Sequence, residues 1–486
     1  MSTSSNKLSV LEKVGYSLGD LAANLVFQTL MTYLAYFYTD IYGLETGDAA
    51  VITLTVGLVA AFAFNPIMGA IADRTNTRWG KFRPWILWTS VPLGVAALLA
   101  FSTPDFDYKY NVIYAAVTYS LLLLLYAANN LPYAALSGVI TGNMGERNSI
   151  SSYRFVAVMV AQFFVQVFMY DLILKVGGGD KALGIERLMT YLAIIGTILL
   201  LITFFTTRER IVPAPEQKST LKDDVGDLVR NRPWVIMLVL TTLVFITLAM
   251  KGNSYVYYFE NYVNKASLEA FLAPMTGVLF GLGLSFENSV SMGLGVFNGG
   301  GIIFMIVGIT LSKRLADKYG KRDVFMSALF VSALFVFAFV FFPPEAIGLI
   351  FLFQILHGFF YGLTIPLLWA MIADVADFSE WKNNRRATAI IFSAMMVGLK
   401  GGLSIGQALV TWILGMYEYV PQKPNTEPII QPETAIIGTK MLVSVYPAIP
   451  FIIGCALLFF YEINKDLETQ IEQDLENRRL DRQLLP

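Results

Sequence analysis

Cysteine, histidine and charge are all scarce in this chain. Cys455 is the single cysteine among 486 residues, which excludes an internal disulfide and a cysteine-rich metal site. Only 15% of the residues are charged, whereas an ordinary soluble domain has about 25%. The net charge is −1 and the basic residues are scattered, so nothing indicates a nucleic acid partner. We find no nucleophile and base set and no nucleotide loop, and we expect neither an enzyme nor a cofactor.

Long apolar runs are what the chain has instead. Hydrophobic residues make up 56% of it, and a helix needs roughly 20 mostly apolar residues to cross a bilayer. Segments 51–72, 326–342 and 441–461 approach or meet that length. The repeated runs predict an all-α membrane protein. No cleavage site follows a short apolar core near the start, so we expect the first helix to be retained.

The chain is expected to have twelve membrane spans. They are placed near 15–39, 49–72, 85–102, 110–135, 151–174, 188–207, 233–258, 289–311, 324–342, 347–373, 388–416 and 441–462. Nineteen Lys and Arg residues fall in loops on one side and seven on the other. By the positive-inside rule the richer side is cytoplasmic. We therefore expect an inner-membrane protein with both termini in the cytoplasm.

A charged loop signature occurs twice and indicates an internal repeat. Asp73 after the second span and Asp317 after the eighth lie 244 positions apart, and Arg147 and Arg386 lie 239 apart. Duplicated halves in such a protein are typical of a rocking transporter. The predicted domains are a six-helix bundle over 1–207, a cytoplasmic linker over 208–232, a second bundle over 233–463 and a tail over 464–486. We expect the tail to be polar, cytoplasmic and helical.

Three segments resemble a known family. The loop 72–85 reads ADRTNTRWGKFRPW, the first span contains Gly19-Asp20, and 373–382 reads ADVADFSEWK. These segments resemble the glycoside–pentoside–hexuronide:cation symporters of the major facilitator superfamily, which include melibiose permease, and the similarity runs from about Lys13 to Lys465. The resemblance implies secondary transport of a glycoside, pentoside, hexuronide or oligosaccharide by alternating access.

Polar residues inside the spans are the natural candidates for a binding site, because charges are costly in lipid. Asp20 shares a helical face with Asn24, and the resemblance implies that Asp20 binds sugar. An ion pair that merely closes the bundle is the alternative. In the fourth span Tyr126 and Asn130 share a face and could stack on a sugar and bond its hydroxyls, although such residues also join helices to one another.

Two basic residues extend this candidate site. Arg154, in the fifth span, is placed like the family's sugar-site arginine, and its alternative is a side chain that snorkels to the cytoplasmic surface. Lys400, in the eleventh span, either pairs across the bundle or contacts substrate. We favour a packing role for His357 over a proton relay, but its role stays open.

A cytoplasmic gate is the other expectation that the resemblance carries. Its ion pairs would hold the two halves together and break when the carrier opens inward; exposed loop charges with little effect are the alternative. The residues are Asp73, Arg147, Asp374, Asp377, Glu380 and Arg386.

The chain departs from the family at the cation site. The acidic positions before Pro66 are Ala61 and Asn65, and the third carboxylate position is Asn130. A sodium site usually needs a negative charge among its hard oxygen ligands, so we expect a proton in preference to sodium. A uniporter or a non-transporting sugar sensor is the alternative. We expect a monomer in the lipid bilayer whose partner is a small sugar, which the sequence does not identify.

Overall fold

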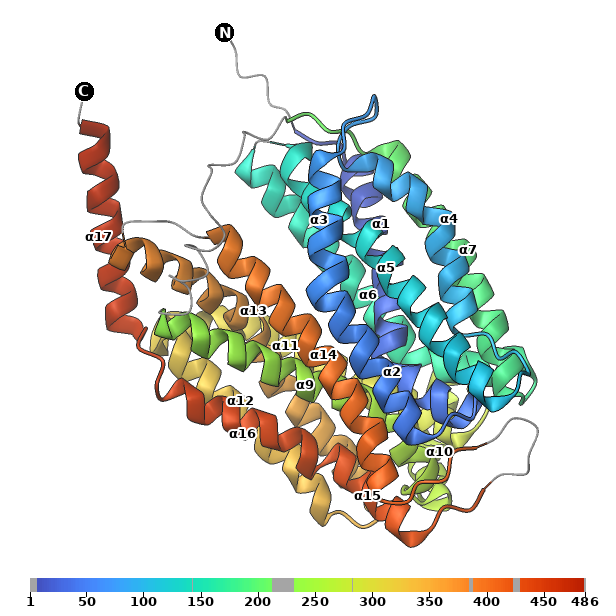
Figure 1. Cartoon of the computed structure of the whole chain (residues 1–486). Helices are drawn as coiled ribbons and strands as arrows, with labels where there is room; N and C mark the ends of the chain where they lie inside the picture. Colours follow the sequence, from blue (N-terminus) through green and yellow to red (C-terminus); the bar gives the residue numbers. More distant parts are fainter. Residues whose placement is uncertain are drawn as a thin grey trace. The chain divides into compact units, whose positions relative to one another are not determined.

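The computed structural model describes residues 7–141, 143–211, 231–281, 283–383, 388–422 and 429–484. This part of the chain is helical, and its one strand-like contact is an isolated bridge between Thr77 and Gly80 (Figure 1). The predicted all-α class is confirmed. Helices are the expected answer, because a spanning segment must satisfy its backbone hydrogen bonds internally.

The helices fall into two series along the chain. The first comprises α1 (Val10–Tyr36), α2 (Thr46–Val59), α3 (Asn65–Arg74), α4 (Arg83–Ala100), α5 (Tyr108–Ile140), α6 (Met144–Gly177) and α7 (Lys181–Thr206). The second comprises α9 (Arg232–Asn261), α10 (Lys265–Gly281), α11 (Ser289–Tyr319), α12 (Lys321–Ala338), α13 (Ile347–Asn383), α14 (Thr388–Met416), α15 (Glu433–Val443), α16 (Val445–Leu458) and α17 (Lys465–Leu484).

Eleven helical segments in the described part are long and apolar enough to cross a membrane. Helix α1 is long enough but is not among them, because Asp20, Asn24 and Gln28 lower its hydropathy. These three residues lie four apart and share one face. Counting α1 as a further span agrees with the prediction of twelve.

The chain divides into two compact units. The first unit consists of residues 1–216, 272–295 and 407–435, and the second of 217–271, 296–406 and 436–486. The predicted division at the 208–232 linker stays a prediction, and most of that linker lies outside the described residues.

The first unit is held by close helix packing. Helix α1 packs against α6 and α7, and α4 packs against α5 and α7. At Gly184 a Cβ would collide with the backbone of Ile173, so glycine is needed where α7 meets α6. Such small residues let membrane helices approach one another. The side chains of Asn143 and Asp180 cap the first backbone N–H groups of α6 and α7.

The second unit is built around α12, which packs against α13 and α16, while α16 also packs against α9. Helix α17 contributes Ile471 and Leu475 to the apolar core of this unit. The Trp381 indole N–H of α13 donates to Asp474 of α17 at 2.8 Å. The prediction of a helical tail is therefore confirmed, and one face of that tail is buried.

Two local features were not expected from the sequence. Helix α10 occupies a segment between the predicted seventh and eighth spans. The second span contains a π-helical turn, Ala60–Phe64, immediately before Asn65 and Pro66. Proline lacks a backbone N–H and disturbs a helix, and single π turns are a common adjustment. The Asn65 side-chain nitrogen donates to the Ala60 carbonyl at 2.5 Å, which stabilises this turn.

Candidate functional site

An ion pair in the first unit forms the centre of the candidate site. Arg154 Nε of α6 lies 2.7 Å from Asp20 Oδ2 of α1, and the two side chains are 27% and 8% exposed. The pair joins two helices that pack against each other. Asp20 and Arg154 are thus in direct contact, whereas a sugar ring between them would require the pair to open.

Two stacked tyrosines support the guanidinium group. The rings of Tyr16 and Tyr133 are 4.7 Å apart at an angle of 16°, and Arg154 lies over both, at 5.6 and 5.4 Å from their centroids. Each hydroxyl donates to the other residue's backbone carbonyl, at 2.9 and 2.7 Å. A Cβ at Gly19 would collide with the Tyr133 ring, so the glycine beside Asp20 makes room for this platform.

The pair retains hydrogen-bonding capacity. Among the described residues, Asp20 Oδ1 has a single long contact of 3.5 Å, with the Asn24 side chain. The Asn24 nitrogen donates mainly to the Asp20 carbonyl, at 2.9 Å. The terminal nitrogens of Arg154 make no hydrogen bond that we find to a described residue. A carboxylate accepts and a guanidinium donates, so together they can bind adjacent hydroxyls, each of which does both.

The other predicted site residues are distributed over both units. Tyr126 of α5 is close enough to Asp20 to interact with its charge. Asn130 is half-buried, and we find no hydrogen bond from its side chain to a described residue. Lys400 lies in α14, in the second unit. The sequence analysis missed Tyr16, although its position four residues before Asp20 places it on the same face.

The degenerate cation positions lie at the π turn of the second span. Ala61 is buried within that turn. The Asn65 side-chain nitrogen is engaged by the turn's own backbone. Neither residue brings a negative charge to this position.

Two of the predicted gate residues, Asp374 and Arg147, make contacts within their own units. Lys321 of α12 contacts both carboxylate oxygens of Asp374 at 2.7 and 2.8 Å, and Glu468 of α17 at 2.8 Å. Arg147 donates to the carbonyls of Thr141 and Gly138, both at 2.9 Å. The sequence analysis did not foresee Glu468 as a partner.

The other four gate residues lie on α13 or outside the described residues. Asp377 and Glu380 lie further along α13. The Asp73 side chain and Arg386 lie outside the described residues. The gating role of all six residues stays a prediction.

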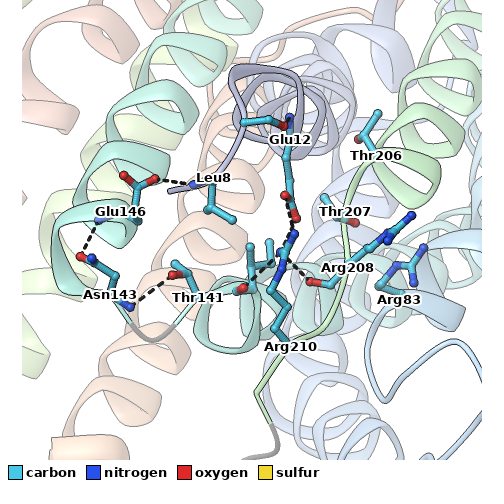
Figure 2. A network of polar contacts seen from close by, with 12 residues as sticks. Leu8, Glu12, Arg83, Thr141, Asn143, Glu146, Thr206, Thr207, Arg208 and Arg210 are labelled. Carbon is cyan, nitrogen blue, oxygen red and sulfur yellow. Dashed lines mark hydrogen bonds and ion pairs between the residues drawn. The ribbon is translucent and has the colours of Figure 1, made fainter. Parts of the chain in front are cut away.

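A polar network fixes the end of α1 near the chain start (Figure 2). Arg210 contacts both oxygens of Glu12 at 2.6 and 2.9 Å, and this hydrogen bonding raises the pKa of Arg210. Glu146 accepts from the Leu8 backbone at 3.1 Å and pairs with Lys13 at 2.9 Å. The network ties α1 to α6 and to the segment that follows α7.

The RWGKFR loop is organised by one carboxylate. Glu209 accepts the backbone N–H groups of Lys81, Phe82 and Arg83 at 2.7 to 2.8 Å. Gly80 has φ +115°, and a Cβ there would collide with the Glu209 carboxylate. The loop therefore requires glycine for two reasons, its backbone conformation and the space for Glu209.

His357 is packed in the second unit. Its Nδ1 lies 2.8 Å from the Ser332 hydroxyl, and its ring stacks on Tyr361 and Phe451 at 5.8 and 6.4 Å. Nearby, Lys251 of α9 is buried. The sequence analysis missed Lys251, although a lysine inside the predicted span 233–258 is a sufficient signal.

The sequence matches the family described as MFS/sugar transport protein over residues 15–287 and 284–465. The chain belongs to this family. It is 33% identical over 479 residues to the inner membrane symporter YicJ of Escherichia coli (strain K12), covering 98% of this chain and 97% of that protein. It is 28% identical over 476 residues to the isoprimeverose transporter of Lactiplantibacillus pentosus, covering 96% and 91%.

Solved structures support the same fold. The nucleoside transporter NupG (D323A mutant) aligns with TM-score 0.61 at 14% identity, over 93% of this chain and 100% of that one. An inward-facing, occupied bacterial homologue of the human lysosomal transporter Spinster aligns with TM-score 0.61 at 13% identity, over 93% and 95%. The chain is a multi-pass membrane transporter of the major facilitator fold, as the motifs predicted, and not an enzyme.

Proposed function

We propose that this transporter carries a glycoside, pentoside, hexuronide or oligosaccharide by alternating access, and that the pair formed by Asp20 and Arg154 binds its hydroxyls. The observation that carries the proposal is that pair on its tyrosine platform. It places a buried acceptor beside a half-buried donor, with one carboxylate oxygen and two guanidinium nitrogens still able to bond a ligand. Relatives whose names are an isoprimeverose transporter and a glucuronide carrier homologue support a sugar as the substrate class.

The coupling ion is proposed to be a proton rather than sodium. Moving a cation out of water costs several kcal/mol unless charge and ligands replace its hydration. Ala61 and Asn65 are neutral, so neither side chain compensates the charge of a bound sodium ion. Asn130 could add only a weak carbonyl ligand. These residues favour a proton, which needs a single basic atom and no multi-oxygen shell.

The membrane placement is part of the proposal. The bias of basic loops supports an inner-membrane protein with both termini in the cytoplasm. We also propose that the chain acts as a monomer in the lipid bilayer.

Counterflow in proteoliposomes tests the proposal. Vesicles containing the purified protein and an unlabelled sugar should accumulate the labelled sugar transiently when its structure fits the site. The assay uses a panel of glycosides, pentosides and uronides, with protein-free vesicles as the control. Binding of a sugar without counterflow would instead identify a non-transporting sensor. Counterflow that is independent of both pH and sodium concentration would identify a uniporter.

A further inference from the structure

The charges inside the membrane-spanning segments do not balance. Away from their outermost residues, the predicted spans contain three cations, Arg154, Lys251 and Lys400, and two carboxylates, Asp20 and Asp171. Asp171 is paired with Lys175 at 2.7 Å. Asp20 is already engaged by Arg154. Lys251 is therefore left with no carboxylate among the described residues, in a region where charge is costly.

Lys251 is the buried cation for which we find no carboxylate partner among the described residues. It lies in α9, is only 8% exposed, and makes no hydrogen bond or ion pair that we find to a described residue. Its ammonium group lies 5.7 Å from the centroid of the Tyr255 ring, at cation–π range. A ring alone does not replace the hydration of an ammonium group, and a buried charge without a partner is costly. The geometry therefore points to a partner that comes from outside the chain.

Two polar side chains near Lys251 each have a nitrogen for which we find no hydrogen bond to a described residue. Gln354 and His357 of α13 are three residues apart and share a face, and His357 is close enough to interact with the Lys251 charge. The Gln354 oxygen accepts from the Tyr255 hydroxyl at 3.1 Å, which leaves its nitrogen. Ser332 occupies His357 Nδ1, which leaves Nε2, a donor when Nδ1 accepts from the Ser332 hydroxyl or when the ring is protonated.

The composition of this cluster distinguishes it from the pair in the first unit. A sugar hydroxyl both donates and accepts, and Asp20 with Arg154 offers both functions. Lys251 and the Gln354 nitrogen only donate, and no described carboxylate contacts Lys251. A set of donors with a positive charge suits an anion, and a carboxylate bonds such groups strongly. The Tyr255 and Tyr361 rings lie beside Lys251 and His357, respectively.

We propose that Lys251, His357 and Gln354 form a binding site in the second unit for the carboxylate of an acidic sugar. The substrate class is then a uronic acid or its glycoside. This inference rests on the proposed sugar transport and narrows its substrate class to acidic sugars.

Calorimetry on the purified full-length protein tests the inference. The probes are methyl β-D-glucopyranosiduronate and methyl β-D-glucopyranoside, together with the corresponding galactose pair, so that each pair differs only at C6. The wild-type protein should bind the acid of the preferred pair at least about tenfold more tightly than the neutral sugar. Lys251→Met should abolish that preference, and Lys251→Arg should retain most of it.

Lys440→Met is the matched control. Lys440 also lies over a tyrosine ring, at 5.2 Å from the centroid of Tyr262, but in α15, and its substitution should leave the preference intact. If Lys251→Met fails to fold, two other measurements test the inference. The wild-type protein should still prefer the acid, and Gln354→Leu should weaken binding of the acid but not of the neutral sugar.

Several results would overturn the inference. One is equal binding of acid and neutral sugars by the wild-type protein, which would leave the proposed transport of neutral sugars standing. A second is an acid preference that survives Lys251→Met. A third is neutral-sugar binding that requires chloride, because the site would then hold a free anion. A fourth is neutral-sugar binding that depends on pH in the wild type and not in Lys251→Met, which would make Lys251 a proton site.

Discussion

Replacing Asp20 with asparagine should abolish sugar binding while the protein still folds. The substitution keeps the size of the side chain but removes the charge that holds Arg154 at 2.7 Å. Arg154 would still lie over the Tyr16 and Tyr133 rings, and at 27% exposure it can still be hydrated. The loss of stability should therefore fall below the 3 to 5 kcal/mol that is typical when a fully buried pair is broken.

The loss of affinity can be worked out from the same atoms. A hydrogen bond to a charged group contributes about 1.5 to 3 kcal/mol. One such bond corresponds to a loss of about 10-fold to 150-fold in affinity. Oδ1 is the Asp20 oxygen that can still bond a hydroxyl, and the loss of that bond together with the release of Arg154 should take sugar binding out of the range of calorimetry. Arg154→Gln should have a similar effect, and the double variant should be little worse than either single one, because both residues act on the same hydroxyls.

Glu12→Gln is the matched control for this experiment. Glu12 lies on the same helix and pairs with Arg210 at 2.6 Å, outside the candidate site. It should lower the melting temperature in detergent and leave sugar affinity unchanged. If Asp20→Asn behaves as Glu12→Gln does, then the pair formed by Asp20 and Arg154 only holds α1 against α6, and the sugar site lies elsewhere.

Three further outcomes are expected. Exchanging sodium for choline at fixed pH should change sugar affinity less than tenfold, and a tenfold effect would contradict our interpretation of the second span. Sugar affinity should vary with pH if a proton is coupled, because a coupling ion and the sugar strengthen each other's binding reciprocally. Gly80→Ala should lower the free energy of unfolding by about 1 to 3 kcal/mol, because Gly80 has a positive φ. Gly196→Ala, where a Cβ has open space, should not; equal melting temperatures of the two variants would contradict this prediction. Asp171→Asn should lower the free energy of unfolding by about 1 to 3 kcal/mol, because Asp171 accepts from the Glu287 backbone at 2.6 Å and the Ser291 hydroxyl at 2.8 Å. A melting temperature equal to that of the wild type would contradict this prediction.

The sequence predicted the fold well because the bilayer leaves few alternatives. A run of apolar residues that must satisfy its own backbone bonds becomes a helix, so counting runs located the spans. The same reasoning could not anticipate α10, which connects two spans and whose 17 residues are too few to be recognised as one. Nor could it anticipate the π turn at Ala60–Phe64, which depends on how the helix adjusts before Pro66.

The candidate site could be predicted only one helix at a time. Helical spacing placed Asp20 and Asn24 on one face, and a matched motif supplied Arg154. The partner of Tyr16, however, is Tyr133, which lies 117 positions away, and no spacing rule relates two residues on different helices. Lys251 was missed for a different reason, because it lies outside the three segments that resemble the family.

The two candidate sites together constrain how the transporter is driven. A proton bound to Asp20 would remove an acceptor that the sugar needs, so it would weaken sugar binding, whereas symport requires the two to strengthen each other. A coupled proton should therefore reside on another group. If the substrate is a uronate, as Lys251 suggests, it enters the cell as an anion against a negative interior, at a cost of about 2.3 kcal/mol for each 100 mV. One proton carried with it removes that cost, and a second would let the membrane potential drive uptake. An acidic substrate thus makes uniport energetically unfavourable and makes symport the expected mode.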